Sequence, residues 1–180
     1  MSRQPLLTLL EKYTPTDQEE ILFKEDLISF VQNHSSCFER TLLKGHITGS
    51  AWIINKDCTK ALLTHHSKLD RWLQLGGHAD GNSDVIGVAL KEAREESGLN
   101  SIRIVSGEIF DLDIHSIPER KNEPRHLHYD LRFLFKADEH ETLHVSSESK
   151  NLKWIAMNDL SKYTQHNKSI LRMKEKCYKR

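Results

Sequence analysis

The chain is poor in cysteine, and the few cysteines it has are isolated. Cys37, Cys58 and Cys177 are odd in number and lie far apart. This spacing argues against a disulfide framework and against a Cys-x-x-Cys zinc site. Scattered thiols of this kind are typical of a reducing compartment, so the sequence predicts a cytoplasmic protein.

Long apolar runs and an excess of charge of one sign are missing as well. No stretch approaches the roughly 20 apolar residues of a membrane-spanning helix, and the run from Leu6 to Leu10 is too short for a signal peptide. The formal net charge is +0, so we expect no basic surface that holds nucleic acid. With 180 residues, of which 37% are hydrophobic, the chain suits one soluble domain with an extension.

The extension is predicted at the N-terminus and is helical. A short helix follows Pro5, and Thr16 or Asp17 is placed to cap a second one. The apolar stripe of the second helix consists of Ile21, Leu22, Leu27, Ile28 and Val31. The chain is therefore predicted to divide into a helical extension, residues 1–44, packed on a core domain, residues 45–180.

Past residue 44, strand patterns and helix patterns are interspersed. Strands are predicted over residues 47–55, 61–64, 102–106, 108–114, 125–136 and 152–155, and helices over residues 84–97 and near Ile170. Some of these strands are close enough to form hairpins. We therefore predict an α/β fold whose sheet is mixed rather than purely parallel.

The helix predicted over residues 84–97 follows a glycine loop. Ser83 or Asp84 is placed to cap its start, and Gly98 is placed to end it. Its expected core stripe consists of Ile86, Leu90 and Ala93. Glutamates form a second face, roughly 120° from the stripe at ~100° per residue. That angle directs them along the edge of the fold, toward a cleft.

The glutamate face consists of Glu92, Glu95 and Glu96, which are three and four residues apart. Like charges at this spacing repel by roughly 0.2–0.5 kcal/mol for each pair. A divalent cation would convert that repulsion into binding, and carboxylate oxygens are the hard ligands that Mg²⁺ prefers. The pattern favours a metal-dependent phosphate enzyme. A solvated surface in which Lys91 pairs with Glu95 is the alternative.

With its flanking residues, the glutamate helix resembles the Nudix box. That motif is a glycine, five residues, a glutamate, seven residues and then Arg-Glu-aliphatic-x-Glu-Glu-x-Gly-aliphatic. The residues that match it are Gly77, Glu92, Ala93, Glu95, Glu96, Gly98 and Leu99. Ser83 stands where the family has its first glutamate, and Asp84 beside it is a candidate replacement. Lys91 stands where the family has arginine, and because it lacks the planar fork we expect it to hold Glu92 less firmly.

The resemblance implies a Nudix-type α/β/α sandwich and hydrolysis of a diphosphate linked to another group, often a nucleoside. It implies Mg²⁺ as the cofactor, with Mn²⁺ as an alternative. The implied metal ligands are the Gly76 carbonyl and the carboxylates of Glu92, Glu95 and Glu96. The implied catalytic residues are Glu92, Glu95, Glu96, Lys91 and Glu148. Glu148 matches a glutamate that precedes a late tryptophan strand, here at Trp154. We expect Glu92 as the general base, with Glu148 as the second candidate.

Polar side chains alternate along the strand predicted over residues 125–136. The residues on its polar face are His126, His128, Asp130 and Arg132, and the preceding strand carries Asp111, Asp113 and His115 in the same alternation. If the two strands pair, these residues form one polar sheet face. His78 and Asp80 project from the glycine loop and are placed to meet it.

Three interpretations of this polar face stay open. It is a solvated hairpin surface, or a substrate pocket in which histidine and arginine contact phosphate or base, or a transition-metal site, since imidazoles suit zinc, iron and manganese. The substrate-binding candidates are His78, Asp80, His126, His128, Asp130, Arg132 and Trp72, which could stack a base or belong to the core. The loop over residues 76–81, together with the His-x-His-x-Asp strand, resembles a bacterial Nudix subgroup.

The function implied is thus a Mg²⁺-dependent pyrophosphohydrolase acting on a small-molecule nucleotide or another diphosphate. A catalytically weak or inactive nucleotide-binding sensor of the same fold is the alternative, and Ser83 and Lys91 favour it. A Nudix-type isomerase of an allylic diphosphate is a further alternative without a sequence signal. No nucleic-acid or membrane partner is expected. A homodimer is compatible with the fold, in which dimers are common.

Overall fold

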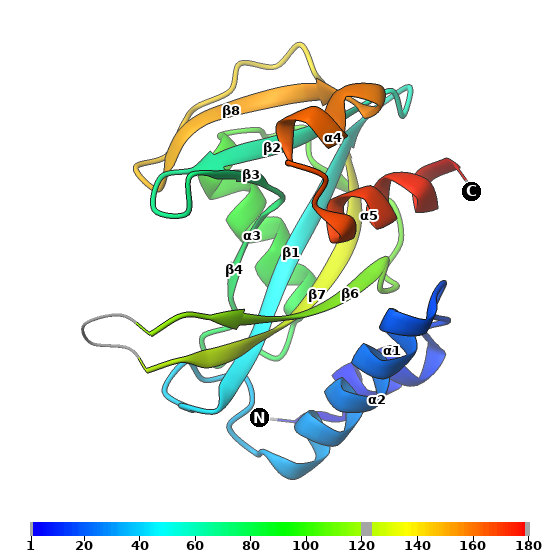
Figure 1. Ribbon diagram of the computed structural model, residues 1–180, viewed down its shortest axis with the longest axis vertical. Helices are drawn as coiled ribbons and strands as arrows, with labels where there is room; N and C mark the ends of the chain where they lie inside the picture. Colours follow the sequence, from blue (N-terminus) through cyan, green and yellow to red (C-terminus); the bar gives the residue numbers. More distant parts are fainter. Residues whose placement is uncertain (1, 120–123, 179–180) are drawn as a thin grey trace.

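An eight-stranded mixed sheet forms the centre of the protein (Figure 1). The computed structural model describes residues 2–119 and 124–178. The strands are β1 (Gly45–Asn55), β2 (Lys60–His66), β3 (Arg71–Leu73), β4 (Leu75–His78), β5 (Arg103–Ile104), β6 (Asp111–Ile117), β7 (His126–Ala137) and β8 (Ser149–Ala156). The helices are α1 (Gln4–Lys12), α2 (Gln18–Asn33), α3 (Val85–Ser97), α4 (Leu160–Tyr163) and α5 (Lys168–Tyr178), with a 3-10 helix, η1 (Met157–Asp159), before α4.

The sheet is built around β1. This strand pairs in parallel with β7 over its whole length, from Gly45 opposite Leu127 to Asn55 opposite Ala137. Its other edge pairs antiparallel with β2 near its end and with β4 nearer its start. β3 and β8 pair with β2, while β5 and β6 pair with β7. Because β2 and β4 share one edge of β1, the sheet divides between β3 and β4.

Helices cover both faces of the sheet, with α3 on one side and α5 on the other (Figure 1). Ile53 of β1 belongs to a buried cluster shared with α1, α2 and α3, whereas its neighbour Trp52 belongs to a second buried cluster shared with α4 and α5. Successive residues of a strand point to opposite faces, so one strand serves both cores. The α/β/α sandwich with a mixed sheet is therefore confirmed.

The glutamate helix, α3, begins and ends as predicted but presents a different core face. Asp84 caps it by accepting a hydrogen bond from the N–H of Gly87 at 3.1 Å, and Gly98 ends it at a φ of 74°. Its buried apolar residues are Val85, Val88, Ala89 and Ala93, whereas Ile86 and Leu90 are only partly buried. The predicted stripe is therefore right for Ala93, and its other two residues pack against the core from its margin. The reason is close packing on β1, where a Cβ on Gly49 would lie 2.7 Å from the Val85 carbonyl oxygen.

The strands predicted over residues 102–106 and 108–114 are shorter or displaced. β5 covers only two residues, and β6 begins at Asp111 and continues to Ile117. Ile109 and Phe110 are buried outside any strand, one in each core. Their apolar character reflects burial in the loop that enters β6, which a periodicity pattern cannot distinguish from a strand.

The N-terminal helices pack through fewer apolar residues than expected. Asp17 caps α2 by accepting from the N–H of Glu20 at 2.9 Å. Leu27 and Val31 are buried, but Ile21 and Leu22 are exposed by 40% and 54%, so the predicted stripe is wrong at its start. There the buried position belongs to Glu20, which contacts α5. None of the helices within residues 2–119 and 124–178 combines the length and apolarity needed to cross a membrane.

Candidate active site

The glutamates of α3 lie against the glycine pair at the start of β4. The N–H of Gly76 donates to Oε2 of Glu96 at 3.3 Å. A Cβ built on Gly77 would lie 2.6 Å from the carboxylate of Glu92. A residue with a side chain at position 77 would therefore clash with Glu92 in its present conformation. Two of the implied metal ligands therefore converge on β4, beside the division of the sheet.

Glu95 and Lys91 occupy the more exposed side of the same helix. Nζ of Lys91 lies 3.2 Å from Oε2 of Glu95 and 3.3 Å from Oε1 of Glu92. Lys91 thus bridges the two carboxylates and offsets their repulsion. Because the Lys91 side chain is 63% exposed, each contact contributes below about 1 kcal/mol. Such a bridge can give way when a cation of higher charge binds.

Glu96 is the most perturbed of the three glutamates. Burial raises its pKa to about 8, and the negative charges of Glu92 and Glu148 act in the same direction, while the Gly76 N–H opposes them. Glu148 therefore lies close enough to act on Glu96, although it belongs to the loop before β8. Three carboxylates from two separate parts of the chain contribute to one negative site.

This donor set fits a divalent cation. Among the described residues, the groups that act on Glu96 include two carboxylates and no cationic side chain. A carboxylate that is buried without a counter-charge is costly unless a cation or a proton neutralises it. Oxygen donors from glutamates and a backbone carbonyl are the ligands that Mg²⁺ and Mn²⁺ take in proteins.

The polar sheet face expected from the paired strands is present. β6 and β7 are antiparallel, with Asp111 opposite Arg132, Asp113 opposite Asp130 and His115 opposite His128. Asp111, Asp130 and Arg132 are 0%, 1% and 2% exposed. A plain solvated surface is therefore wrong for this part of the face.

Arg132 is held by three aspartates. Its guanidinium contacts Asp130 at 2.8 Å, Asp111 at 3.0 Å and Asp113 at 3.0 Å. Burial alone would lower the pKa of Arg132, but the carboxylates outweigh it and raise that pKa. Asp130 also accepts hydrogen bonds from Thr48 and Ser50 of β1. These contacts favour a supporting role for Asp130 and Arg132 beneath the surface that a substrate would touch.

The two polar residues of the glycine loop, His78 and Asp80, have different partners. His78 meets the polar face, with its Nε2 3.3 Å from Nε2 of His128. Asp80, which was expected to do the same, forms an ion pair with Arg40 at the surface. His126 lies beside His128, with ring centroids 5.2 Å apart. Sequence reasoning missed His46, whose ring lies 4.9 Å from those of both His78 and His128.

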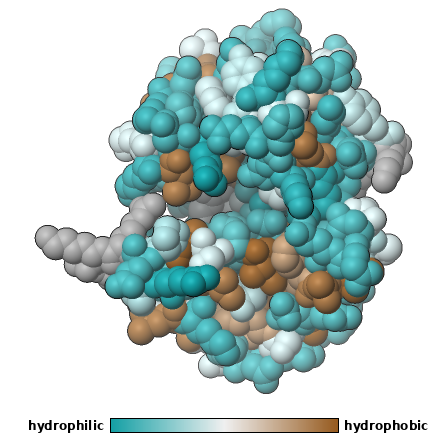
Figure 2. Space-filling view, viewed as in Figure 1, coloured by the Kyte–Doolittle hydropathy of each residue, from teal (hydrophilic) through white to brown (hydrophobic). Residues whose placement is uncertain are grey.

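Trp72 lies at the rim of a pocket. Its ring stacks on His65 at 5.0 Å and meets Tyr163 edge-on at 5.7 Å. The pocket, of about 380 Å³, is lined by His65, Asp70, Arg71, Trp72, Lys162, Tyr163, Thr164 and Gln165. It combines aromatic rings with cationic side chains. In the space-filling view, the surface is hollowed across its middle, between the part that carries β2, β3 and β8 and the part that carries the β6–β7 hairpin (Figure 2).

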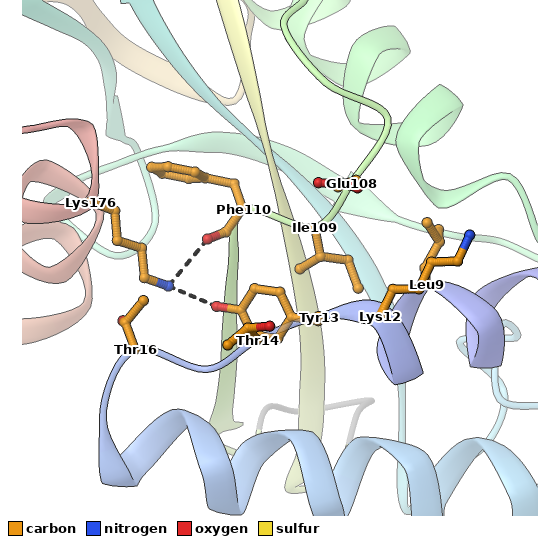
Figure 3. A pocket seen from close by; sticks show the side chains of 9 residues that line it. All are labelled: Leu9, Lys12, Tyr13, Thr14, Thr16, Glu108, Ile109, Phe110 and Lys176. Atoms are coloured by element: carbon orange, nitrogen blue, oxygen red, sulfur yellow. Dashed lines mark hydrogen bonds between the residues drawn. The ribbon is translucent and has the colours of Figure 1, made fainter. Parts of the chain in front are cut away.

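A second pocket, of about 270 Å³, lies where the loop after α1 meets α5 (Figure 3). Lys176 projects into it and donates to the hydroxyl of Tyr13 at 2.8 Å and to the carbonyl of Phe110 at 3.1 Å. Lys176 also pairs with Glu20 and Asp111. Its charge is thus compensated within the fold, and the pocket is separate from the glutamates of α3.

The sequence did not single out the charged residues that join α2 and α5 to the sheet. Arg172 contacts Asp111 at 2.9 Å, and Lys176 lies beside Glu20 and Asp111. Their signal was a mixture of cations and apolar residues in the C-terminal helix, which is also typical of a solvated end. Only the positions of Asp111 and Glu20 in the fold distinguish a helix whose cations are buried and paired from one whose cations are solvated.

Comparison with known proteins connects this geometry to a family. A family model described as the NUDIX domain matches residues 45–176. A probable DHNTP pyrophosphohydrolase of Lactococcus lactis is 27% identical over 146 residues, which cover 77% of this chain and 81% of that protein.

Solved structures show the same fold. A NUDIX family hydrolase of Clostridium perfringens is 29% identical with a TM-score of 0.53, over 74% of this chain and 96% of that one. An Ap4A hydrolase of C. elegans is 22% identical with a TM-score of 0.55, over 71% of this chain and 93% of that one.

Proposed function

The chain belongs to the Nudix hydrolase family, which makes it a hydrolase of phosphoric anhydride bonds, and we propose that it cleaves a nucleoside diphosphate linked to another group in a Mg²⁺-dependent reaction. One observation carries the proposal. Glu92 and Glu96 converge on Gly76 and Gly77, and the charge of Glu148, from another part of the chain, acts on Glu96.

We assign the metal site to Glu92, Glu95, Glu96 and the carbonyl of Gly76. Mn²⁺ is compatible with the same oxygens. When bound, the ion polarises the phosphoryl oxygens and lowers the pKa of an attacking water. Glu92, whose side chain is 23% exposed, is the first candidate to accept the proton of that water, and Glu148 is the second. Lys91 positions Glu92 and Glu95.

The pocket at Trp72 supports a nucleotide or a similar aromatic diphosphate as the substrate. Trp72 precedes Gly76 by four residues, so the two Cα atoms are at most roughly 14 Å apart. That span accommodates a base on the aromatic side and a diphosphate at the glutamates. Arg71 and Lys162 line the same pocket, and Lys162 also pairs with Asp159 at 2.8 Å. The name of the Lactococcus relative, a probable DHNTP pyrophosphohydrolase, is consistent with a substrate that joins a ring system to phosphates.

We keep His78, His126 and His128 as candidates for contact with the substrate. They lie at the end of the polar face that is away from Arg132. We also propose that residues 1–44 are an extension packed on the core of residues 45–180, and that the protein works in the cytoplasm with its three cysteines as free thiols. A homodimer remains part of the proposal without an assigned interface.

A substrate panel tests the activity. Purified protein is incubated with Mg²⁺ and with nucleoside diphosphate sugars, dinucleoside polyphosphates, NADH, nucleoside triphosphates or dihydroneopterin triphosphate, and the products are separated by chromatography. We expect hydrolysis of at least one class, its loss on chelation, and its return with Mg²⁺ or Mn²⁺. Glu96→Gln should abolish turnover, whereas Glu175→Gln, an exposed glutamate of α5, should not.

Two outcomes would count against the proposal. Turnover that persists at the wild-type rate in folded Glu96→Gln would remove the assigned metal site. Tight nucleotide binding without hydrolysis of any panel member would favour the nucleotide-binding sensor, for which the departures at Ser83 and Lys91 already argue.

A further inference from the structure

Three histidines from three strands meet at one end of the polar sheet face. His46 of β1 lies opposite His128 of β7, and His78 of β4 lies opposite Thr48, two residues along β1 from His46. Each ring offers a nitrogen that lies within 4.8 Å of the other two. Among residues 2–119 and 124–178, these three histidines are the group of potential metal ligands whose ligand atoms lie this close together.

The spacing of the rings suits a metal ion of small radius. The three ring centroids form a nearly equilateral triangle, with sides of 4.9, 4.9 and 5.0 Å. Nε2 of His78 and Nε2 of His128 are 3.3 Å apart. In a tetrahedral zinc site with Zn–N bonds of about 2.0–2.1 Å, two ligand nitrogens are separated by about 3.3–3.4 Å.

His46 gives an independent reason to expect a ligand here. The residue is 3% exposed, and neither ring nitrogen has a hydrogen-bond partner among the described residues. Leaving a buried polar group unsatisfied costs about 1–3 kcal/mol. A metal ion would satisfy one of these nitrogens.

Two more histidines, His126 and His115, lie beside this group. The hydrogen-bond partner of each ring indicates which of its nitrogens carries a proton. Nδ1 of His126 lies 2.8 Å from the carbonyl oxygen of Pro124, and Nδ1 of His115 lies 3.0 Å from a carboxylate oxygen of Asp113. Both partners are acceptors only, so each Nδ1 carries a proton, and in the neutral form of the ring the lone pair is on Nε2. The rings of His126 and His46 are 5.0 Å apart, and those of His115 and His128 are 5.4 Å apart.

We propose that His46, His78 and His128 bind one divalent transition-metal ion, best matched by Zn²⁺, with a fourth position left for water or an anionic group. The site is separate in chemistry from the glutamates of α3. Nitrogen donors select zinc and related ions, whereas the glutamate oxygens select Mg²⁺ or Mn²⁺. The inference does not depend on the proposed hydrolysis, because it rests on the three strands and their rings alone.

Zinc titration of the chelator-treated full chain tests the site. Bound Zn²⁺ is measured by competition with a chromophoric chelator in excess Mg²⁺, and the stoichiometry by elemental analysis. We expect one Zn²⁺ per chain. His78→Ala and His128→Ala should each weaken binding by more than about 100-fold, beyond the 10–100-fold typical of losing a supporting residue. His140→Ala, which removes an exposed histidine, should leave binding unchanged, as should Glu96→Gln.

A second measurement needs no variant. Addition of Zn²⁺ to the ¹⁵N-labelled wild-type protein should shift the ring nitrogens of His46, His78 and His128 in a long-range ¹H–¹⁵N spectrum, and should leave His140 in place. Zn²⁺ that binds His128→Ala as tightly as His140→Ala would overturn the proposal. So would a wild-type spectrum in which the three rings do not respond to one equivalent of Zn²⁺.

Discussion

Replacement of Gly77 by alanine should remove activity while leaving the fold intact. The added Cβ would lie 2.6 Å from Cδ and Oε2 of Glu92 and 2.9 Å from its Cγ. These atoms are the far end of a flexible side chain, so Glu92 can rotate away without disturbing the backbone. The stability should be unchanged or should rise by up to about 1 kcal/mol, since alanine restricts the unfolded chain more than glycine does.

The activity should respond differently, because Glu92 is displaced from the position that it holds beside Gly77. A misplacement of about 1 Å at a catalytic group can cost about 100-fold in rate, and we expect a loss of kcat/KM of that order in Gly77→Ala. The measurement is the steady-state rate on the substrate found in the panel, together with thermal unfolding of the same preparation.

Two other glycines provide the controls. Gly107→Ala places its Cβ in open space, so activity should match the wild type, and stability should be unchanged or rise by up to about 1 kcal/mol, as for Gly77→Ala. Gly76→Ala meets the backbone of Gly49 and Ser50 at 2.7 Å and has a φ of 156°, so it should lower stability by about 1–3 kcal/mol or more. For a chain of this size, each kcal/mol shifts Tm by roughly 2–4 °C. A Gly77→Ala variant with wild-type kcat/KM would refute the reasoning, and so would a loss of activity that only followed a fall in Tm.

Three further predictions concern charged groups. Lys91→Arg should raise kcat/KM a few-fold, because a guanidinium can hold Glu92 through two hydrogen bonds; a fall in kcat/KM would show that the lysine is adapted to this site. Glu92→Gln should lower kcat by more than about 100-fold and Glu148→Gln by less, if Glu92 is the base; the reverse order in stopped assays would exchange their roles. Urea unfolding at several pH values should show stability falling as pH drops from about 4.5 to about 2. Burial alone would raise the pKa of Glu20, but hydrogen bonds, led by the one from Lys176, lower that pKa to about 2. As the pH falls, the carboxylate is therefore protonated in the unfolded chain before it is protonated in the folded one. The free energy of unfolding should decrease by about 3 kcal/mol across that window. Glu20→Gln should flatten this part of the curve, and an unchanged slope would contradict the assignment.

Local patterns carried most of the prediction for α3. Asp84 and Gly98 end the helix through hydrogen bonds and backbone angles that involve only near neighbours in the chain. The three-and-four spacing of Glu92, Glu95 and Glu96 likewise defines a helix face before any tertiary contact exists. The face that packs on the sheet could not be read in the same way, because the closeness of Gly49 decides it.

The buried charges show where such reasoning ends. Arg132 was a candidate for contact with phosphate or base. Asp130 shares its strand face, but only the register of β6 with β7 brings Asp111 and Asp113 onto the same guanidinium. Lys176 and Glu20 are separated by 156 residues, and their pairing depends on α2 and α5 meeting at the same edge of the sheet. A charge pattern in one helix holds no information about a partner so distant.

The sequence by itself determined the fold class, the family and the glutamate helix with its glycine loop, because these depend on short-range periodicity and on spacing within one segment. Only the tertiary structure decided what each polar side chain faces. The parallel pairing of β1 with β7 places His46, an isolated histidine in a buried strand, beside His128, and the pairing of β1 with β4 adds His78. The histidine site exists because register between distant strands, rather than local sequence, sets which rings meet.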